Sequence, residues 1–204
     1  MVKAMDTAFI LHADHELHAS TFTARVTAAT LTDIYSAMTS AIAALKGPLH
    51  GGANAEVMKM LEEIGDAYKA EGWVKRQLAD KKKVPGFGHR VYRCVDPRAT
   101  VLRESARQIT TLTGKTRYFE IALEVEKAML SHSKVYPNVD FFSAPLYNAM
   151  DIPTELFTPI FAISRAVGWT AHILEQWKHN RLIRPTAHYI GPSLTPYADI
   201  GTRS

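Results

Sequence analysis

Two histidines of this chain lie at glycine-rich breaks between predicted helices. The stretch GPLHGGAN (47–54) places His50 between a Gly-Pro turn and a Gly-Gly pair, directly before a helical pattern. The stretch GFGHRV (86–91) places His89 in a second glycine-containing loop. Imidazole exchanges protons near neutral pH, and glycine lets a ligand approach the backbone closely. Either histidine alone could equally fill a turn, so the surrounding residues must decide between a chemical and a structural role.

A third group of histidines, His12, His15 and His18, follows at steps of three in LHADHELHAS. Such a cluster can bind a metal ion, which keeps a zinc hydrolase open as an alternative. The metalloprotease pattern His-Glu-x-x-His requires two residues between Glu16 and the next histidine, and this sequence has one. The spacing therefore predicts no metal site.

One carboxylate and several arginines could complete an acid–base site. Asp140 follows the helix-breaking pair Pro137-Asn138, Arg93 and Arg98 come soon after His89, and Arg165 interrupts an apolar helix. A guanidinium can bind a carboxylate or phosphate through two parallel hydrogen bonds. Asp140 could instead cap a helix, and Arg165 could pair with a buried carboxylate. Their joint occurrence with histidines at breaks indicates a pocket for an acidic substrate.

The elements that must position these residues are helices throughout. Apolar residues recur at helical spacing, and no stretch alternates with the period of a strand, so the predicted fold class is all-α. Ser20 or Thr21 is a plausible cap for the first long helix, Asn54 for the second, and Asp96 with Pro97 for a third. The predicted helical segments are 20–47, 55–65, 70–83, 98–114, 116–133, a short one from 140, and 154–180, followed by an irregular tail.

Composition excludes several classes of protein. The 204 residues are 47% hydrophobic and 22% charged, which is ordinary for a globular protein, and the lone Cys94 cannot form an internal disulfide. No apolar run reaches the ~20 residues that cross a bilayer, and residues 1–16 lack the apolar core of a secretory signal. The net charge of +4 is scattered, and Lys81–Lys83 lacks interleaved aromatics. We therefore expect a cytoplasmic protein that binds neither nucleic acid nor membrane.

Six motifs in this order resemble the citrate synthase family of bacterial type, and the resemblance covers nearly all of the chain. They are HADHE (12–16), KGPLHGGAN (46–54), GFGHRVY with DPRA (86–99), NVDFFSA (138–144), FTPIFAISRAVGW (157–169) and RLIRPTAHYIGP (181–192). The resemblance implies a mainly α-helical homodimer or higher oligomer, with the active site between a large and a small domain. By the same resemblance, residues 1–51 belong to the large domain, 52–152 form the small domain, and 153–204 return to the large domain.

The family's reaction joins acetyl-CoA to oxaloacetate and hydrolyses the citryl thioester to citrate and CoA. The resemblance makes Asp140 the base that takes a proton from the acetyl methyl group. It makes His50 the donor to the enolate oxygen and His89 the residue that polarises the ketone of oxaloacetate. It implies no tightly bound cofactor, because acetyl-CoA is a co-substrate.

Binding residues are carried over in the same way. His15, Arg98 and Arg165 match positions that hold oxaloacetate and citrate, and Arg184 matches an arginine contributed by the neighbouring subunit. The loop with Val84, Gly86 and Gly88 resembles the backbone that receives CoA, and Arg93 resembles a phosphate contact.

Two departures from the family pattern stand out. His18 occupies the position of asparagine in the family's HELNAS. Complete members also have an amino-terminal portion of comparable length ahead of HADHE, so we expect a fragment, a truncated product or one half of a split enzyme, with exposed apolar surface. The alternatives are 2-methylcitrate synthase, which uses propionyl-CoA, and a catalytically silent helical module.

Overall fold

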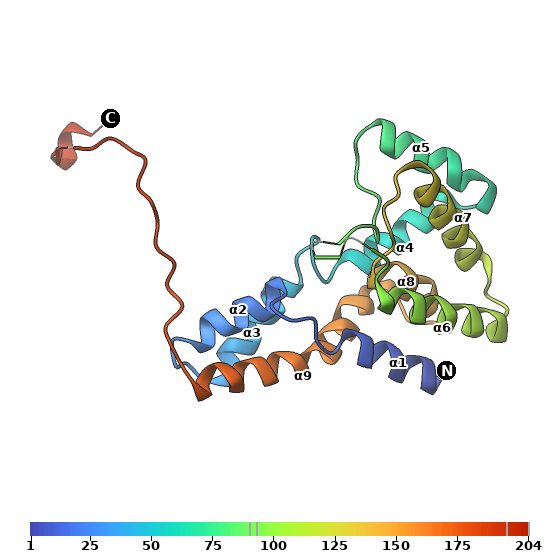
Figure 1. The fold of residues 1–204 in the computed structure, drawn as a ribbon, viewed down its shortest axis with the longest axis horizontal. Coiled ribbons are helices and arrows are strands. Elements are labelled where there is room, and N and C mark those ends of the chain that lie inside the picture. The colour runs from blue at the N-terminus through green and yellow to red at the C-terminus, as the bar shows by residue number, and fades with distance from the viewer. Residues whose placement is uncertain (90, 93, 195, 204) are drawn as a thin grey trace.

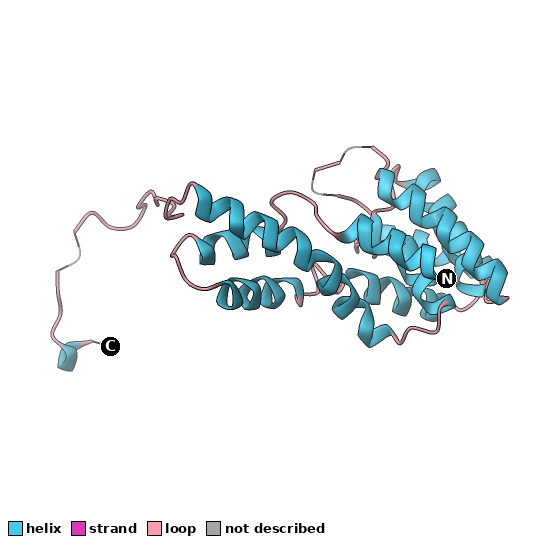
Figure 2. Ribbon diagram, turned by 90° about the horizontal axis from the view of Figure 1, so that it is seen from below, coloured by secondary structure: helices cyan, strands magenta, loops and turns pink. Residues whose placement is uncertain are grey.

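The computed structural model describes residues 1–89, 91–92, 94–194 and 196–203, and within them the fold is entirely helical (Figures 1 and 2). An isolated bridge between Phe87 and Pro137 is the one strand-like pairing of the described residues. The predicted all-α class is confirmed. The α-helices are α1 (Val2–His12), α2 (Ala19–Ala28), α3 (Ile34–Leu45), α4 (Ala53–Ile64), α5 (Ala70–Ala79), α6 (Pro97–Thr113), α7 (Arg117–His132), α8 (Val139–Ala149) and α9 (Phe157–Lys178). Short 3-10 turns lie at Ala67–Lys69, Thr154–Leu156 and Ile200–Thr202.

Two hydrophobic clusters hold these helices together. The larger is built from α4 to α8, and α1 adds Ala4 and Ala8 to it. The smaller is built from α2, α3 and α9. Helix α9 belongs to both, because its first turns bury Phe157 in the larger cluster and its later turns bury Trp169 in the smaller one. In Figure 1, α9 accordingly runs from below α8 to the α2–α3 pair. The domain boundaries given above stay predictions.

The single long helix expected over residues 20–47 is wrong. The chain turns between α2 and α3, where Leu31 has a positive φ of 64°. Asp33 then caps α3, because its side chain accepts the backbone N–H of Ser36 at 3.0 Å. The two helices pack closely because the facing side chains are small. Those that are fully buried include Ala24, Ala28, Ala37 and Ala41.

The structure places two helix N-caps at residues other than those predicted, and it confirms a third. His18, rather than Ser20 or Thr21, is the N-cap of α2, and Gly52 rather than Asn54 precedes α4. Asp96 caps α6 as expected, accepting the backbone N–H of Arg98 at 3.0 Å, with Pro97 as the first helical residue.

The chain after α9 leaves the body of the protein. Its described residues between α9 and the last 3-10 turn belong to no helix or strand, and Figure 1 shows this segment running away from the nine α-helices named above. Across the described part of the chain, no helix is long and apolar enough to cross a membrane.

Candidate active site

The loop between α1 and α2 carries His15 and His18 and is fastened to α9. Arg165 on α9 donates from Nε to the carbonyl oxygen of His12 at 2.7 Å. A Cβ on Gly168 would lie 2.3 Å from the carbonyl oxygen of Ala13, so only glycine lets the loop approach α9 this closely. Between the two histidines the loop bends at Glu16, which has a positive φ of 53°. Such backbone strain in a non-glycine residue needs support from its surroundings, and the contacts with α9 supply it.

His50 is held in the turn that joins α3 to α4. Its backbone N–H bonds the carbonyl of Gly47 at 2.9 Å, and the Thr158 hydroxyl donates to the carbonyl of Gly51 at 3.0 Å. The ring is only 9% exposed. Its Nε2 lies 3.0 Å from His18 Nδ1 and 2.7 Å from the Ser20 hydroxyl oxygen. The turn predicted from GPLHGGAN therefore directs an imidazole toward the loop that carries the other histidines.

Hydrogen bonds with neighbouring residues determine which ring nitrogen of His89 carries the proton. Its Nδ1 accepts the backbone N–H groups of Val91 and Tyr92 at 3.1 and 3.0 Å, so the neutral ring carries its proton on Nε2. That Nε2 lies 3.0 Å from His15 Nε2, and the N–H therefore donates to His15. The Tyr92 ring stacks on His89 with centroids 4.4 Å apart. His89 thus has the N–H that polarising a ketone requires, and in this structure His15 receives it.

Asp140 stands in the first turn of α8, where Asn138 is the N-cap. Its Oδ1 is fully buried and has no hydrogen-bond partner among the described residues. Burial raises the pKa of Asp140 from 3.8 to about 7, against the lowering effect of the positive charges of Arg98 and Arg165. A carboxylate with such a pKa is a far stronger base than an exposed one.

The two arginines differ in how their donors are used. Arg98 forms a bidentate pair with the buried Asp96, at 3.1 Å from Nε and 2.8 Å from Nη2. Arg165 is 1% exposed and lies over the Phe161 ring, and its Nη1 is buried without a partner in the described part of the chain. Burial lowers the pKa of Arg165 to about 10, so it is still a cation at neutral pH. A buried cationic donor without an acceptor suits an anionic ligand.

The histidines around these arginines are neutral at pH 7. Burial lowers the pKa of His15 and of His50 to about 4 and that of His18 to about 3. The charge of Arg165 contributes to each of these reductions. Burial, followed by the charge of Arg98, also lowers the pKa of His89. Arg98 and Arg165 therefore both act on His15 and Asp140. Arg165 alone of the two acts on His18 and His50, and Arg98 alone acts on His89.

Comparison with known proteins decides the family. Residues 1–186 match the sequence profile described as citrate synthase, C-terminal domain. The chain belongs to the citrate synthase family. It is 55% identical over 203 residues to citrate synthase 2 of Bacillus subtilis, covering 100% of this chain and 55% of that protein. It is 45% identical over 201 residues to the 2-methylcitrate synthase of Shewanella oneidensis, covering 98% and 54%.

Solved citrate synthases share the fold. The enzyme from Thermoplasma acidophilum, solved in a ternary complex with carboxymethyl coenzyme A and oxaloacetate, superposes with a TM-score of 0.92 at 41% identity. That match covers 99% of this chain and 55% of the other. The enzyme from Thermotoga maritima gives a TM-score of 0.89 at 43% identity, covering 100% and 56%. This citrate synthase-family chain spans about half the length of the relatives it matches.

The remaining residues predicted for the site belong to the loop around His89 and to the tail of this citrate synthase-family chain. Arg184 is in the extended tail, exposed, with its Nη1 donating to the carbonyl of Pro185. Arg93 lies outside the described residues. In the loop expected to receive CoA, Val84 is buried, Gly88 N–H donates to Tyr136, and the Gly86 carbonyl accepts from Asn138. These two backbone groups are thus already bonded within the protein.

The zinc alternative finds no support in this citrate synthase-family fold. Among the described residues, no three His, Cys, Asp or Glu side chains are grouped as a metal site would require. His12 instead donates from Nδ1 to the carbonyl oxygen of Ala8 at 2.8 Å, within its own helix.

Several residues that contact the candidate site residues, directly or through one another, were not singled out from the sequence. Ser20 contacts His50, Trp169 bonds Ser20, Tyr92 stacks on His89, and Asn138 connects two segments of the site. Asn138 had a detectable signal, because asparagine two residues before a helical aspartate is a capping pattern. Trp169 and Ser20 are 149 residues apart, so no local pattern could have paired them.

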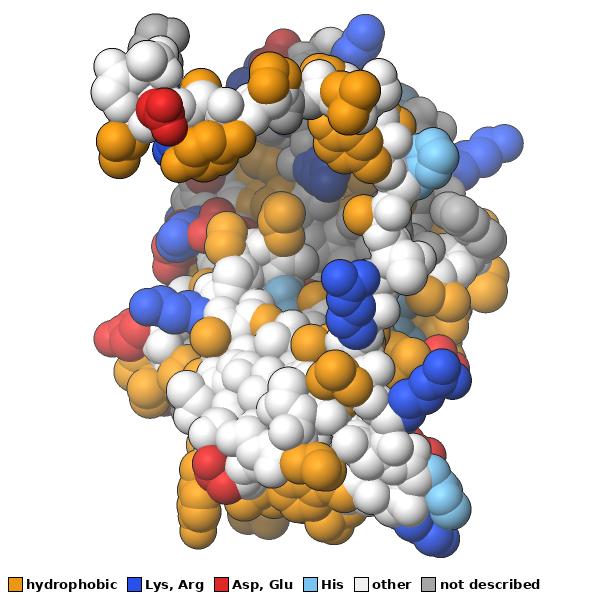
Figure 3. Space-filling view, turned by 90° about the vertical axis from the view of Figure 1, so that its left-hand side faces the viewer, with side chains coloured by type: hydrophobic (Ala, Val, Ile, Leu, Met, Phe, Trp, Pro, Cys, Tyr) orange, Lys and Arg blue, Asp and Glu red, His pale blue; other side chains and the backbone are white. Residues whose placement is uncertain are grey.

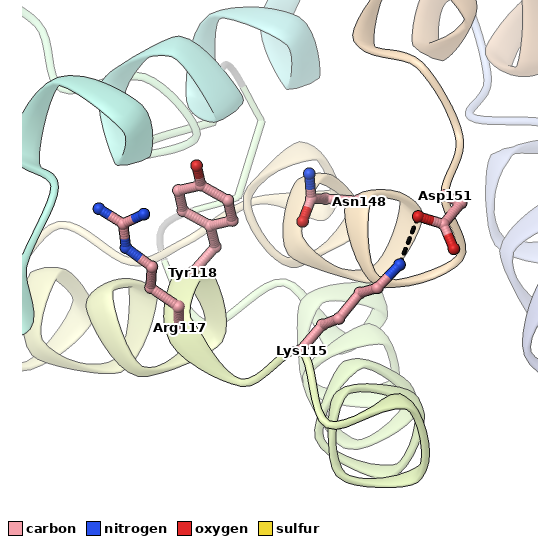
Figure 4. Close-up of a pocket in the computed structure, with 5 residues that line it drawn as sticks. All are labelled: Lys115, Arg117, Tyr118, Asn148 and Asp151. Carbon is pink, nitrogen blue, oxygen red and sulfur yellow. Dashed lines mark hydrogen bonds and ion pairs between the residues drawn. The ribbon is translucent and has the colours of Figure 1, made fainter.

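A surface pocket of about 360 Å³ lies apart from these residues, beside the start of α7 and the end of α8 (Figure 4). It is lined by Lys115, Arg117, Tyr118, Asn148 and Asp151. The ion pair between Lys115 and Asp151 already satisfies the charges at its edge. None of the candidate site residues lines this pocket.

Proposed function

We propose that this chain supplies the acid–base site of a citrate synthase, which condenses acetyl-CoA with oxaloacetate and releases citrate and CoA. One observation carries the proposal above the others. The buried, unpartnered Oδ1 of Asp140, on a carboxyl group whose pKa burial raises to about 7, lies in the field of Arg98 and Arg165, and each of four neutral imidazoles lies in the field of at least one of them. Such a combination fits removal of a weakly acidic C–H proton next to a carbonyl.

In the first step, Asp140 takes a proton from the methyl group of acetyl-CoA, and the C–H electron pair moves to give an enolate. His50 donates a hydrogen bond to the enolate oxygen. Because burial and Arg165 lower the pKa of His50 to about 4, the ring is a neutral donor throughout.

In the second step, the enolate carbon attacks the ketone carbon of oxaloacetate, and the ketone oxygen receives the displaced electron pair. His89 Nε2–H stabilises that oxygen, which requires the ligand to replace His15 as its acceptor. The unpartnered Nη1 of Arg165 is the donor for a substrate carboxylate, with Arg98 as the second cation. The resulting alkoxide takes up one proton, which replaces the one that Asp140 removed from the methyl group, and becomes the hydroxyl group of citryl-CoA. Water then adds to the thioester carbonyl, and CoA leaves as the thiol with a proton from that water, to give citrate.

We extend the proposal to the remaining parts of the site. CoA binds along the loop with Val84, Gly86 and Gly88 and at Arg93. The working form is a homodimer or higher oligomer in the cytoplasm, in which Arg184 of one copy reaches the site of another, and it serves the tricarboxylic acid cycle. The exposed tail supports the proposed oligomer, since it carries Arg184 and exposed apolar residues such as Leu194 and Tyr197. Figure 3 shows hydrophobic side chains along the tail.

A second candidate function is that of a 2-methylcitrate synthase, and the 45% identity to the Shewanella oneidensis enzyme supports it. The same residues would act on propionyl-CoA, with one more methyl group to accommodate. Turnover with each thioester at matched oxaloacetate separates the two, and a strong preference for propionyl-CoA would favour this second candidate.

The experiment for the main proposal is a thiol-release assay with acetyl-CoA and oxaloacetate. It uses the purified chain alone and mixed with the amino-terminal portion of the Bacillus subtilis relative. We expect citrate in at least one preparation and its loss in Asp140→Asn. If neither preparation makes citrate or exchanges the acetyl methyl protons with deuterium, the proposal is wrong and the chain is a catalytically silent helical module.

A further inference from the structure

His18 faces His50 at a position where a helix-capping residue would usually turn back to its own helix. It is the N-cap of α2, yet its side chain makes no capping hydrogen bond. Its ring packs on that of His50 with centroids 4.0 Å apart and 36° between the planes. Its Nδ1 lies 3.0 Å from His50 Nε2. The side chain therefore serves a neighbour 32 residues away rather than its own helix.

The proton positions around His50 follow from a chain of donors. Trp169 Nε1–H can only donate, and it donates to the Ser20 hydroxyl oxygen at 3.1 Å. The fully buried Ser20 hydroxyl has one acceptor among the described residues, His50 Nε2 at 2.7 Å. Buried hydroxyl groups are almost always hydrogen-bonded. His50 Nε2 is therefore the unprotonated nitrogen, and the neutral ring carries its proton on Nδ1.

This arrangement also decides the state of His18. Its Nδ1 faces the lone-pair side of His50 Nε2, and two lone pairs at 3.0 Å would repel each other. His18 Nδ1 must consequently carry the proton and donate it. His50 Nε2 then shares its single lone pair between two donors, the nearer Ser20 hydroxyl at 2.7 Å and His18 at 3.0 Å, while Nδ1–H is left for a ligand.

We propose that His18 is a positioning residue for His50, donating Nδ1–H to His50 Nε2 and packing against its ring. The pair holds His50 in the tautomer whose Nδ1–H can bond an enolate oxygen. Hydrogen bonds in a chain polarise one another, so a donor at Nε2 also strengthens Nδ1–H as a donor. This inference rests on the role proposed above for His50.

The surroundings of the pair support a neutral donor. Burial, followed by the charge of His50, lowers the pKa of His18 to about 3, so His18 brings no charge beside His50. The centroid of the His15 ring lies 6.0 Å from that of His18, and the Phe161 ring forms a T-shaped pair with His50, with centroids 5.8 Å apart. Because the strengthened bond matters most when charge develops on the substrate oxygen, loss of His18 should lower kcat more than it raises KM.

The test compares His18→Leu, which keeps an apolar side chain without a donor, with His18→Asn, whose amide N–H restores one. Histidine-labelled protein is studied by long-range proton–nitrogen NMR, which reads the protonation of each ring nitrogen without needing activity. We expect wild type and His18→Asn to show an unprotonated, hydrogen-bonded Nε2 on His50. In His18→Leu the Nε2 signal should shift toward that of a less strongly bonded acceptor.

The same variants are assayed in a preparation that turns over. We expect His18→Leu to lower kcat roughly tenfold, the worth of one neutral hydrogen bond, with KM changed less than twofold and His18→Asn recovering most of the loss. A protonated Nε2 on His50 in wild type, or an unchanged Nε2 signal in folded His18→Leu, would overturn the inference. If wild type makes no citrate, the proposed function fails by itself, and the NMR comparison still decides whether His18 positions His50.

Discussion

Asn138 donates its side-chain Nδ2–H to the carbonyl oxygen of Gly88 at 3.0 Å, across 50 residues of sequence. Its Oδ1 accepts the backbone N–H of Asp140 at 3.0 Å. One amide group therefore joins the residue before His89 to the helical turn that carries Asp140. Together with the backbone bonds from Asn138 to Gly86 and from Gly88 to Tyr136, this side chain ties the loop of the predicted ketone-polarising group to the helix of the predicted base.

Replacing Asn138 with Ala should reduce both stability and turnover. The variant loses the cap of α8 and the bond to Gly88, which together are worth about 1–3 kcal/mol. It should also lower kcat, because one of the links between the segments that carry Asp140 and His89 is lost while the backbone bonds remain. Urea unfolding measures the first effect and thiol release the second.

Two control variants separate capping from positioning. Asn138→Asp keeps an acceptor for the N–H of Asp140 but cannot donate to Gly88, so it should recover stability more than kcat. Asp33→Ala removes the comparable cap of α3, where Asp33 accepts the N–H of Ser36, and should cost about 1 kcal/mol without changing kcat. Full turnover in folded Asn138→Ala would show that the link does not position the site.

The pKa of Asp140 predicts how turnover depends on pH. The base must be ionised to accept a proton, and burial raises its pKa to about 7. We expect kcat to rise with pH and level off above about 7, and Asp140→Asn to lower it by roughly 10²–10⁴-fold. A pH–rate profile that is flat between pH 5 and 8 would remove Asp140 from the role of base.

The same pKa predicts a stability gain in Asp140→Asn at alkaline pH. The unfolded carboxyl ionises near 3.8 and the folded one near 7, so folding favours the protonated form. Its contribution to stability is complete below 3.8 and is lost as the pH rises through 7. Relative to wild type, the Asn variant should gain up to about 4 kcal/mol across that interval. Urea unfolding at pH 5 and pH 8.5 should show about 3 kcal/mol of this difference, because the rest develops between pH 3.8 and pH 5.

Local chemistry was sufficient to predict the turns that carry the site. Asp96 with Pro97 was recognised as a helix start, and the Gly-Pro and Gly-Gly pairs around His50 located the turn between α3 and α4. The break at Leu31 was missed because alanine-rich sequence continues on both sides of it. No glycine or proline marks that turn, and its signal was the weaker capping preference of Asp33.

The environment of the site residues could not be predicted, because it depends on tertiary contacts between residues that are distant in the sequence. The unpartnered oxygen of Asp140 depends on how α8 packs, and the tautomer of His50 depends on Trp169, which is distant in sequence. Arg165 was recognisable as an unusual residue in an apolar helix. Its hydrogen bonds, however, depend on how α9 packs on the first loop. In that packing Nε donates to the carbonyl of His12, and Nη1 is left for a ligand.

Buried His12 should make the fold sensitive to acid. Burial lowers the pKa of His12 from 6.5 to about 4. His12 therefore binds a proton below pH 6.5 in the unfolded chain but only below about pH 4 in the folded chain. Stability from this residue is present above 6.5 and is lost as the pH falls to 4, by about 3 kcal/mol. His12→Asn should flatten the fall in unfolding free energy between pH 7 and pH 4.5.

A histidine in the exposed tail provides the comparison. His188 is exposed in the folded chain, so His188→Asn should leave the fall in stability as steep as in wild type. If His12→Asn is as acid-sensitive as wild type, the pH dependence comes from the other buried histidines instead.

Gly86 and Gly114 test whether the loop before His89 needs glycine for space as well as for conformation. Both have positive φ, 78° and 71°, which costs any other L-residue about 1 kcal/mol. A Cβ at Gly86 would lie 2.7 Å from the Phe141 ring and 2.8 Å from a Val57 methyl, whereas one at Gly114 meets nothing within 4 Å. Gly86→Ala should therefore be less stable than Gly114→Ala by about 1–3 kcal/mol, the usual cost of overpacking. It should also lower kcat, because relief of the clash displaces Phe141, which is the neighbour of Asp140 in the sequence.

Equal unfolding free energies for the two variants would mean that α8 and the loop separate easily, which contradicts a rigidly positioned site.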